Sequence, residues 1–357
     1  MNTENLPHEI YSGTWKTGHV QGIAIDTERE YIYYSFTTTL VKTDLRGNLV
    51  GTVDGIVGHL GCLDFCDTDG CVYGSLEYKQ DEIGRGILHA LGSDAKLESA
   101  FYIARFDGKK ITRPGMDAER DGIMTAVYLP EVVQDYLGAA SDGTPHIHGC
   151  SGIDGTAFGP RFGERGGKLY LNVAYGVYSD INRRDNDYQV ILTYDTADLD
   201  AYFHPLSQAS PHHNGPDHPA YKYFVHTGNT TYGVQNLEYD AYTGNWFMAV
   251  YPGVKKEYPN YPFFIIDGSK APVLAHLYGF APEVTGETLT LLHDGLHDEA
   301  SGVYGWDFPH GDTGLFALDD GYYYISHNGS TGDGLQYSRV FLYRWTGESP
   351  VPFERIP

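Results

Sequence analysis

The feature of this sequence that most constrains its fold is a short strand pattern that recurs five times. Each copy is a run of aromatic and β-branched residues that follows a turn residue or a charged residue, a composition typical of strands. The five runs are Glu30 to Phe36, Gly70 to Leu76, Gly167 to Val173, Gly244 to Val250 and Gly321 to His327. Because the pattern recurs along the chain, it predicts an internal repeat of sheets.

A strand precedes each run, and two more strands joined by a turn follow it. The preceding strands are expected at His19 to Asp26, Leu60 to Asp67, Asp154 to Gly159, Tyr232 to Asp240 and His310 to Asp319. The following pairs are expected within Leu40 to Val53, Phe101 to Ile111, Gln189 to Phe203, Phe263 to Leu277 and Arg339 to Ile356. Turns such as Asp107-Gly108-Lys109 favour hairpins, because glycine tolerates the positive φ that tight turns require. Each repeat is therefore predicted to be a four-stranded unit.

These units resemble the blades of the β-propeller superfamily, in particular its five-bladed rings. The segment His19 to Asp26 is similar to blade openings of the NHL and gluconolactonase-like propellers. The resemblance implies an all-β fold in which residues 1–357 form one five-bladed β-propeller domain. It identifies no single family, so it assigns no catalytic residue. The blades are expected at about 19–56, 59–114, 146–206, 230–278 and 304–357.

Two stretches, 78–100 and 115–147, do not fit the repeat and are predicted to be helical insertions around blade two. A short helix is expected around Lys96 in the first stretch. In the second, Pro130 to Leu137 has proline at its first position and an acid in its first turn, which favours a helix. Insertions of this length either shape a binding face or pack against the scaffold.

The charge of the chain limits its partners. It contains 24 Lys and Arg residues and 47 Asp and Glu residues, which gives a formal net charge of −23. Nucleic acids and anionic membranes are bound mainly through Lys and Arg, so neither is an expected partner. We expect a small-molecule or oligosaccharide ligand instead. The N-terminal residues lack an export signal, which predicts a cytoplasmic protein, and the four cysteines do not form a disulfide framework.

In a propeller, the loop that enters the innermost strand and the loop that leaves the second strand emerge on the same face. This rule predicts that most of the 16 histidines gather on one face of the ring. Within this set, His146 and His148 are two residues apart, so on an extended segment both rings share a side and can reach one cation. A role of one ring in capping a strand is the alternative.

The resulting candidate site has three groups of residues. The predicted metal ligands are His19, His148, His310 and Gln235, for Ca²⁺ or a transition metal, with no organic cofactor. The predicted catalytic residues are His146, His148, Tyr232 and Arg183. The predicted substrate-binding residues are Glu77, Tyr175, Tyr304, Trp306 and His327. The channel mouth is also expected to include Gln21, Asp154 and Asp312, which either bind a ligand or tie neighbouring blades together.

Several of these residues also have simpler roles. Arg183 and Arg184 suit an anionic group on a substrate, but neighbouring aspartates such as Asp185 are alternative partners. The loop from Pro211 to Pro219 either binds metal or is a solvated connection. Cys62 and Cys66 lie about 13 Å apart on a strand, too far to share one zinc ion, so they are predicted to be core residues. Cys150 follows a histidine by two residues, but no third group to orient a nucleophile is evident.

Three functions fit these features. Thirty tyrosines and four tryptophans on an acidic protein favour a carbohydrate ligand, since sugar rings stack on aromatic faces. The first function is metal-assisted hydrolysis or β-elimination of a sugar or sugar-acid substrate, which makes the protein a hydrolase or lyase. The second is a non-catalytic propeller that binds a glycan or peptide. The third is a glycoside hydrolase with two carboxylates, for which Asp154, Glu238, Asp307 and Asp312 are candidates.

Overall fold

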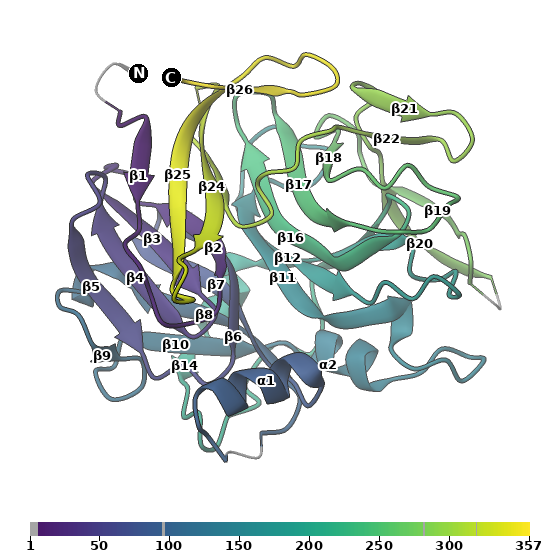
Figure 1. Cartoon of the computed structure of the whole chain (residues 1–357). Coiled ribbons are helices and arrows are strands. Elements are labelled where there is room, and N and C mark those ends of the chain that lie inside the picture. The colour runs from purple at the N-terminus through teal and green to yellow at the C-terminus, as the bar shows by residue number, and fades with distance from the viewer. Residues whose placement is uncertain (1–5, 95–96, 281–282, 319) are drawn as a thin grey trace.

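The computed structural model describes residues 6–94, 97–280, 283–318 and 320–357, which form a five-bladed β-propeller (Figure 1). The innermost strands of the blades contact one another in chain order, and the last of them contacts the first. The colours of Figure 1 follow this ring, and yellow β25 lies beside purple β1 where it closes. The predicted all-β fold with five blades is therefore confirmed.

The first two blades are antiparallel meanders with an added outer strand. Blade one consists of β2 (Val20–Ile25), β3 (Tyr31–Phe36), β4 (Thr39–Asp44), β5 (Leu49–Asp54) and the parallel strand β9 (Met116–Asp117). Blade two consists of β6 (His59–Cys66), β7 (Cys71–Tyr78), β8 (Ala100–Asp107), β10 (Met124–Tyr128) and β14 (His204–Pro205). The fourth strand of blade two thus lies inside the predicted insertion 115–147, after the short helix η2 (Gly108–Lys110).

Blade three is the widest sheet, and it takes strands from well beyond its predicted limits. It consists of β11 (Cys150–Gly159), β12 (Tyr170–Val177), β13 (Tyr188–Asp195), β15 (Tyr221–His226), β20 (Val284–Leu289) and β19 (Val273–Leu277). Its fourth strand is β15, whereas residues after Asp195 form the short helix α3 (Thr196–Asp200). Strand β19 was predicted in blade four, but it pairs with β20 in this sheet.

Blade four consists of β16 (Thr230–Asp240), β17 (Asn245–Pro252) and β18 (Phe263–Ile266). The hairpin β21 (Leu296–Asp298) and β22 (Val303–Gly305) follows it. Blade five consists of β23 (Leu315–Ala317), β24 (Tyr322–Ser330), β25 (Gln336–Trp345), β26 (Phe353–Arg355) and β1 (Glu9–Tyr11).

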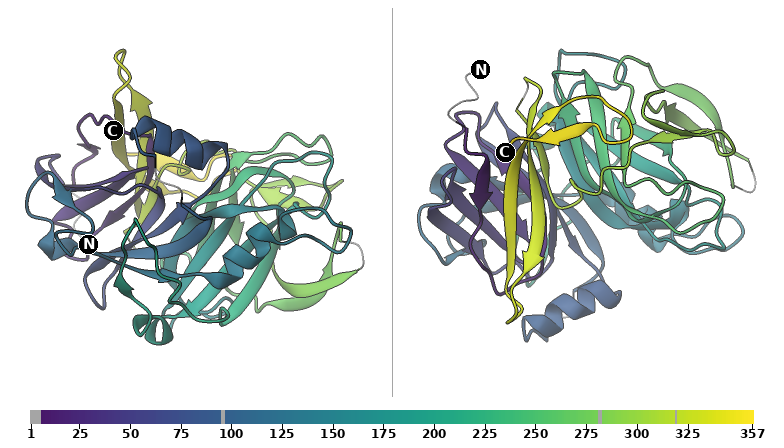
Figure 2. Two further views of the ribbon diagram at one scale, coloured as in Figure 1. Left: turned by 90° about the horizontal axis from the view of Figure 1, so that it is seen from below. Right: turned by 45° about the horizontal axis from the view of Figure 1, so that its top comes forward.

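The ring is closed by the N-terminal strand. Strand β25 pairs with β1 through residues 339–341 and with β26 through residues 343–345, so both ends of the chain complete one outer edge. Figure 2 shows the C-terminus at this blade. Closure of this kind leaves few free sheet edges and joins the first blade to the last.

The hydrophobic core is divided into five clusters, each between two adjacent blades. Buried acids on the inner strands reinforce these interfaces. Asp64 of blade two accepts a hydrogen bond of 2.6 Å from the backbone N–H of Phe158 in blade three. Glu238 of blade four accepts one of 2.7 Å from Ala317 in blade five. Because both acids satisfy backbone donors of the next blade, they hold the ring together, and Glu238 is not a catalytic candidate.

Two longer helices occur in the stretches that do not follow the repeat. Helix α2 (Pro130–Leu137) has the predicted limits. In the first stretch, helix α1 (Glu82–Ala90) lies before the predicted position, and Lys96 is outside the described residues. A further short helix, η3 (Ile147–Gly149), precedes β11. Among the described residues, no helix combines the length and apolar character needed to cross a membrane.

Candidate functional site

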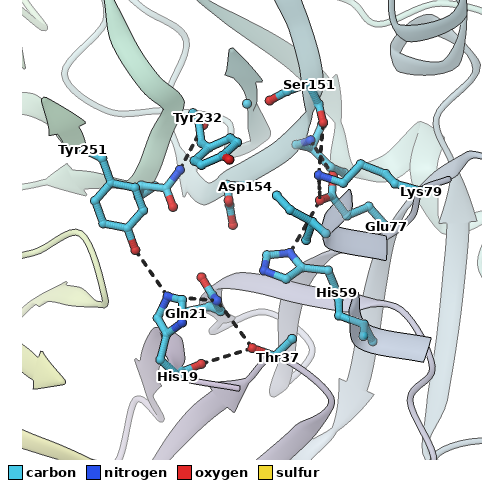
Figure 3. A pocket seen from close by; sticks show the side chains of 15 residues that line it. His19, Gln21, Thr37, His59, Glu77, Lys79, Ser151, Asp154, Tyr232 and Tyr251 are labelled. Atoms are coloured by element: carbon cyan, nitrogen blue, oxygen red, sulfur yellow. Dashed lines mark hydrogen bonds and ion pairs between the residues drawn. The ribbon is translucent and has the colours of Figure 1, made fainter. Parts of the chain in front are cut away.

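A cavity of about 340 Å³ opens at the face where the inner strands begin. We call it the channel cavity (Figure 3). Its lining comes from blades one to four and from helix α1. The lining residues are His19, Gln21, Thr37, His59, Glu77, Lys79, Ile83, Ile87, Ser151, Ile153, Asp154, Gly176, Tyr232, Gln235 and Tyr251. Apart from Ile83 and Ile87 of α1, they lie near the starts of innermost strands and the ends of second strands, which is the face that the loop rule selects.

A β-bulge at the start of each innermost strand in blades one to four aims side chains at this cavity. The register shifts around Gln21 in β2, Gly61 in β6, Asp154 in β11 and Gln235 in β16. A bulge leaves a residue unpaired and turns it away from the regular alternation, and bulges recur next to binding sites. Gln21, Asp154 and Gln235 therefore line the cavity, whereas Gly61 contributes space instead of a side chain.

The charged part of the cavity is the pair of Glu77 and Lys79 at the end of β7. Lys79 Nζ lies 2.5 Å from Glu77 Oε1 and donates to the Ser151 carbonyl at 3.1 Å. The other oxygen, Glu77 Oε2, accepts from the backbone N–H of Ile153 at 3.0 Å. Burial raises the pKa of Glu77 and Lys79 opposes that rise. For Lys79, the nearby carboxylates outweigh burial and raise the pKa, so the two side chains form a buried ion pair.

Asp154 is the second carboxyl group of the cavity, and its environment differs from that of Glu77. Burial and the negative charge of Glu77 raise the pKa of Asp154 well above its usual value. Lys79 and a hydrogen bond from Gln235 act in the opposite direction but do not outweigh them. Its Oδ1 atom is buried and has no hydrogen-bond partner. Asp154 therefore favours its protonated form, and Glu77, whose pKa burial also raises, differs from it in having the Lys79 ammonium as a direct partner.

Two histidines of the cavity favour the neutral form. Burial, with a contribution from the charge of Lys79, lowers the pKa of His59 to about 3. Burial also lowers the pKa of His19. His19 Nε2 lies 3.2 Å from Gln21 Nε2 and 3.4 Å from the Tyr251 hydroxyl (Figure 3). Both rings can therefore exchange hydrogen bonds with a neutral ligand without adding charge.

Tyr232 is the strained residue of the site. Its φ of 62° lies in the left-handed region, which is costly for a residue with a side chain. The Gln235 amide donates to its carbonyl at 2.9 Å, and its side chain is 40% exposed. The strain holds a partly exposed aromatic ring at the cavity, and such strained residues are concentrated at ligand sites.

The structure does not bring the predicted catalytic histidines into this cavity. His148 lies in a separate cavity of about 670 Å³ that Arg183 also lines. His146 and His148 both have positive φ, so the segment is not extended and the two rings do not share a side. His146 Nδ1 lies 2.6 Å from the Tyr136 carbonyl oxygen, and Arg183 pairs with Asp185 at 2.5 Å. The structure thus favours the alternative partner for this arginine.

The remaining predicted residues also lie apart from the channel cavity. Tyr175 is fully buried and donates to Asp135, and Trp306 is buried in the core between blades four and five. Tyr304 lies on the β21–β22 hairpin, stacked on His293 and His297. His310 and His327 of blade five stack on each other at 3.8 Å. Of the twelve predicted site residues, His19, Glu77, Tyr232 and Gln235 line the channel cavity.

The predicted metal ligands fall in three different places. His19 and Gln235 line the channel cavity, His148 lines the second cavity, and His310 lies against His327. Within residues 6–94, 97–280, 283–318 and 320–357, no three His, Cys, Asp or Glu side chains are grouped to hold a metal ion. The residues named as ligands therefore do not fit a shared ion. Cys62, Cys66 and Cys150 are buried free thiols, as expected of core residues.

Sequence reasoning missed some of the lining. Thr37 follows the run Glu30 to Phe36 directly, so the loop rule would have selected it. Ile83 and Ile87 lie on helix α1, which was expected further along the chain. Ser151 and Ile153 belong to β11, whose start was placed at Asp154. Except for Thr37, these residues were missed because the limits of the helix and of the strand were misplaced.

Comparisons with known proteins complete the description. No protein family model matches the chain, and no curated protein matches it in sequence. Solved structures with a similar fold include the PQQ domain of pyranose dehydrogenase from Coprinopsis cinerea, with 12% identity, 89% and 81% of the two chains covered and a TM-score of 0.38. The native arabinanase Arb43A from Bacillus subtilis has 11% identity, 96% and 99% coverage and a TM-score of 0.42. The Dos1 propeller has 10% identity, 90% and 78% coverage and a TM-score of 0.29.

Proposed function

We propose that this protein is a glycoside hydrolase that acts on a neutral sugar in the channel cavity, with Asp154 as the general acid and Glu77 as the second carboxylate. The observation that carries the proposal is that two buried carboxyl groups line one cavity in different surroundings: Glu77 is paired directly with Lys79, whereas Asp154 has a buried oxygen without a hydrogen-bond partner. Glycoside hydrolysis commonly requires this pair: one acid protonates the leaving oxygen and one carboxylate activates water or attacks the sugar.

The division of roles follows from the neighbours of each carboxyl group. Lys79 lies 2.5 Å from Glu77 and stabilises its carboxylate, which suits a base or nucleophile. Asp154 combines a raised pKa with an unpartnered Oδ1 atom, which suits a proton donor. Asp307 is exposed and Asp312 does not line the cavity, so neither is preferred. The two-carboxylate mechanism therefore has better support than the metal-assisted one.

The polarity of the cavity supports a neutral sugar. Gln21, Thr37, Gln235 and the two neutral histidines offer donors and acceptors for hydroxyl groups, and Tyr232 offers an aromatic face. Lys79 is the one Lys or Arg side chain in the lining, and Glu77 already neutralises it. A uronate carboxylate would therefore meet no free cation there, which disfavours the sugar-acid substrate and the elimination that it would allow.

The proposal is tested with a panel of para-nitrophenyl glycosides of neutral pentoses and hexoses, with the corresponding uronides as negative controls. We expect the protein to hydrolyse at least one neutral glycoside and no uronide. Asp154→Asn should lower kcat for the phenyl glycoside of the same sugar by about 10²–10⁴-fold, the usual contribution of a general acid. Asp312→Asn, which changes an acid that does not line the cavity, should have little effect. Binding of a sugar without any turnover would instead support a non-catalytic propeller.

A further inference from the structure

Helix α1 presents an unusual apolar surface to the channel cavity. Ile83 and Ile87 are four residues apart, so they lie on the same side of the helix, and both line the cavity. No residue of α1 is buried, although the helix is amphipathic. Figure 2 shows α1 standing out from the ring of blades. Its apolar side is thus only partly covered by neighbouring residues such as Val57 and Leu97, and part of it faces the cavity.

The helix is nevertheless held in place at its start. Asp81 caps it by accepting a hydrogen bond of 2.9 Å from the Gly84 backbone. Asp81 also accepts from the Tyr178 hydroxyl at 3.2 Å and lies 3.7 Å from Lys79 Nζ. Lys79 in turn pairs with Glu77. The apolar side of α1 is therefore tied to the charged pair of the site.

The lining of the cavity consequently combines polar and apolar side chains. Gln21, Gln235 and Asp154 contribute polar groups to the lining, whereas Ile83, Ile87 and Ile153 contribute apolar side chains. Ile153 directly precedes Asp154, so the apolar part of the lining adjoins the acid that would protonate a leaving group. An unsubstituted sugar has hydroxyl groups around its whole edge, and those facing three isoleucines would lose their hydrogen bonds to water.

From this arrangement we propose that Ile83 and Ile87 form a subsite for an apolar leaving group. The substrate class is then a glycoside of a phenol or hydrophobic alcohol, and not an oligosaccharide. This inference rests on the proposed glycoside hydrolase function. Burial of an aromatic or alkyl group against the two side chains removes apolar surface of both partners from water, which favours binding.

The test compares phenyl and methyl glycosides of the sugar that the panel identifies, using the full chain. Affinities of both ligands are measured by calorimetry with Asp154→Asn, so that hydrolysis does not interfere. We expect the phenyl glycoside to bind at least about 10-fold more tightly than the methyl glycoside. Adding Ile83→Ala and Ile87→Ala should remove this preference and leave the affinity for the methyl glycoside unchanged. His89→Ala, an exposed change near the end of the same helix, should preserve the preference.

The outcomes separate the two proposals. Equal affinities for the two glycosides, or an equal loss of both in the double isoleucine variant, would refute the apolar subsite and leave the hydrolase proposal standing. If neither glycoside binds, both proposals are wrong. Thermal unfolding of each variant shows whether the ring is intact, and we expect little change because neither isoleucine is buried.

Discussion

Gly61 is the position at which one added methyl group tests the site most sharply. A Cβ atom there would lie 2.3 Å from Asp154 Oδ1 and 2.3 Å from Ser75 Oγ. Ordinary contacts to carbon are about 3.5–4 Å long, so the neighbours must move by more than an ångström. Gly61 does not have a positive φ, so backbone strain adds nothing to the effect. Gly61→Ala therefore acts through the Asp154 carboxyl group.

The expected magnitude follows from this overlap. Overpacking of a buried site costs about 1–3 kcal/mol. The smaller conformational entropy of alanine in the unfolded chain offsets about 0.4–1 kcal/mol of that cost. We expect a net loss of about 0–2.6 kcal/mol in the free energy of unfolding. Displacement of the acid by about 1 Å should also lower kcat by about 100-fold.

The assay combines urea unfolding with hydrolysis of the phenyl glycoside of the sugar that the panel identifies, because this substrate depends on the general acid. Gly166→Ala is the matched control, because a Cβ atom at Gly166 would meet nothing within 4 Å. The control should leave stability and kcat nearly unchanged. If Gly61→Ala also leaves kcat within about twofold of the native value, Asp154 is not the acid or its position is not critical.

Three other changes test separate parts of the site. Lys79→Met should lower the free energy of unfolding by about 3–5 kcal/mol in urea titrations, because it leaves Glu77 buried without its partner. Lys168→Met, in an exposed pair with Asp195, should have little effect. Tyr232→Gly should be neutral or stabilising by up to about 1 kcal/mol, since glycine accepts a positive φ, but calorimetry should show roughly 10-fold weaker sugar binding. The folded-state pKa of Asp154 is raised, so its stabilising contribution is complete below the ordinary pKa of about 3.9 and is lost as pH rises towards the folded-state pKa. Over that range of pH, Asp154→Asn should therefore become more stable relative to the native protein. A constant difference between the two proteins in urea unfolding would contradict the raised pKa.

The sequence could predict the fold because the repeat is local. Each central run, such as Tyr31–Phe36, carries its own strand composition and is bounded by turn residues. The outer strands were harder to predict. Strand β15 follows a long loop, β19 pairs with a different blade, and β1 joins the last blade from the other end of the chain. Such pairings depend on which edges meet in the ring, and the local sequence does not encode that.

The site was only partly predictable for a related reason. The loop rule selected the face at which the channel cavity opens, and with it the lining residues His19, Glu77 and Tyr232. The rule does not distinguish positions beside the channel from positions further out on the same face. His148 was therefore placed near the channel, although it lies in another cavity. The bulges that aim Gln21 and Asp154 inward also depend on strand pairing. The raised pKa of Asp154 could not be predicted from the sequence either, because it depends on burial and on the charge of Glu77.

The most direct test of the proposed mechanism is the dependence of Asp154→Asn hydrolysis on the leaving group. A general acid matters most when the departing oxygen is basic, so loss of the acid should harm phenyl glycosides more than para-nitrophenyl glycosides. We predict a loss in kcat/KM of about 10²–10⁴-fold for the phenyl glycoside and a much smaller loss for the para-nitrophenyl glycoside. Equal losses for the two substrates would contradict the assignment of Asp154 as the proton donor.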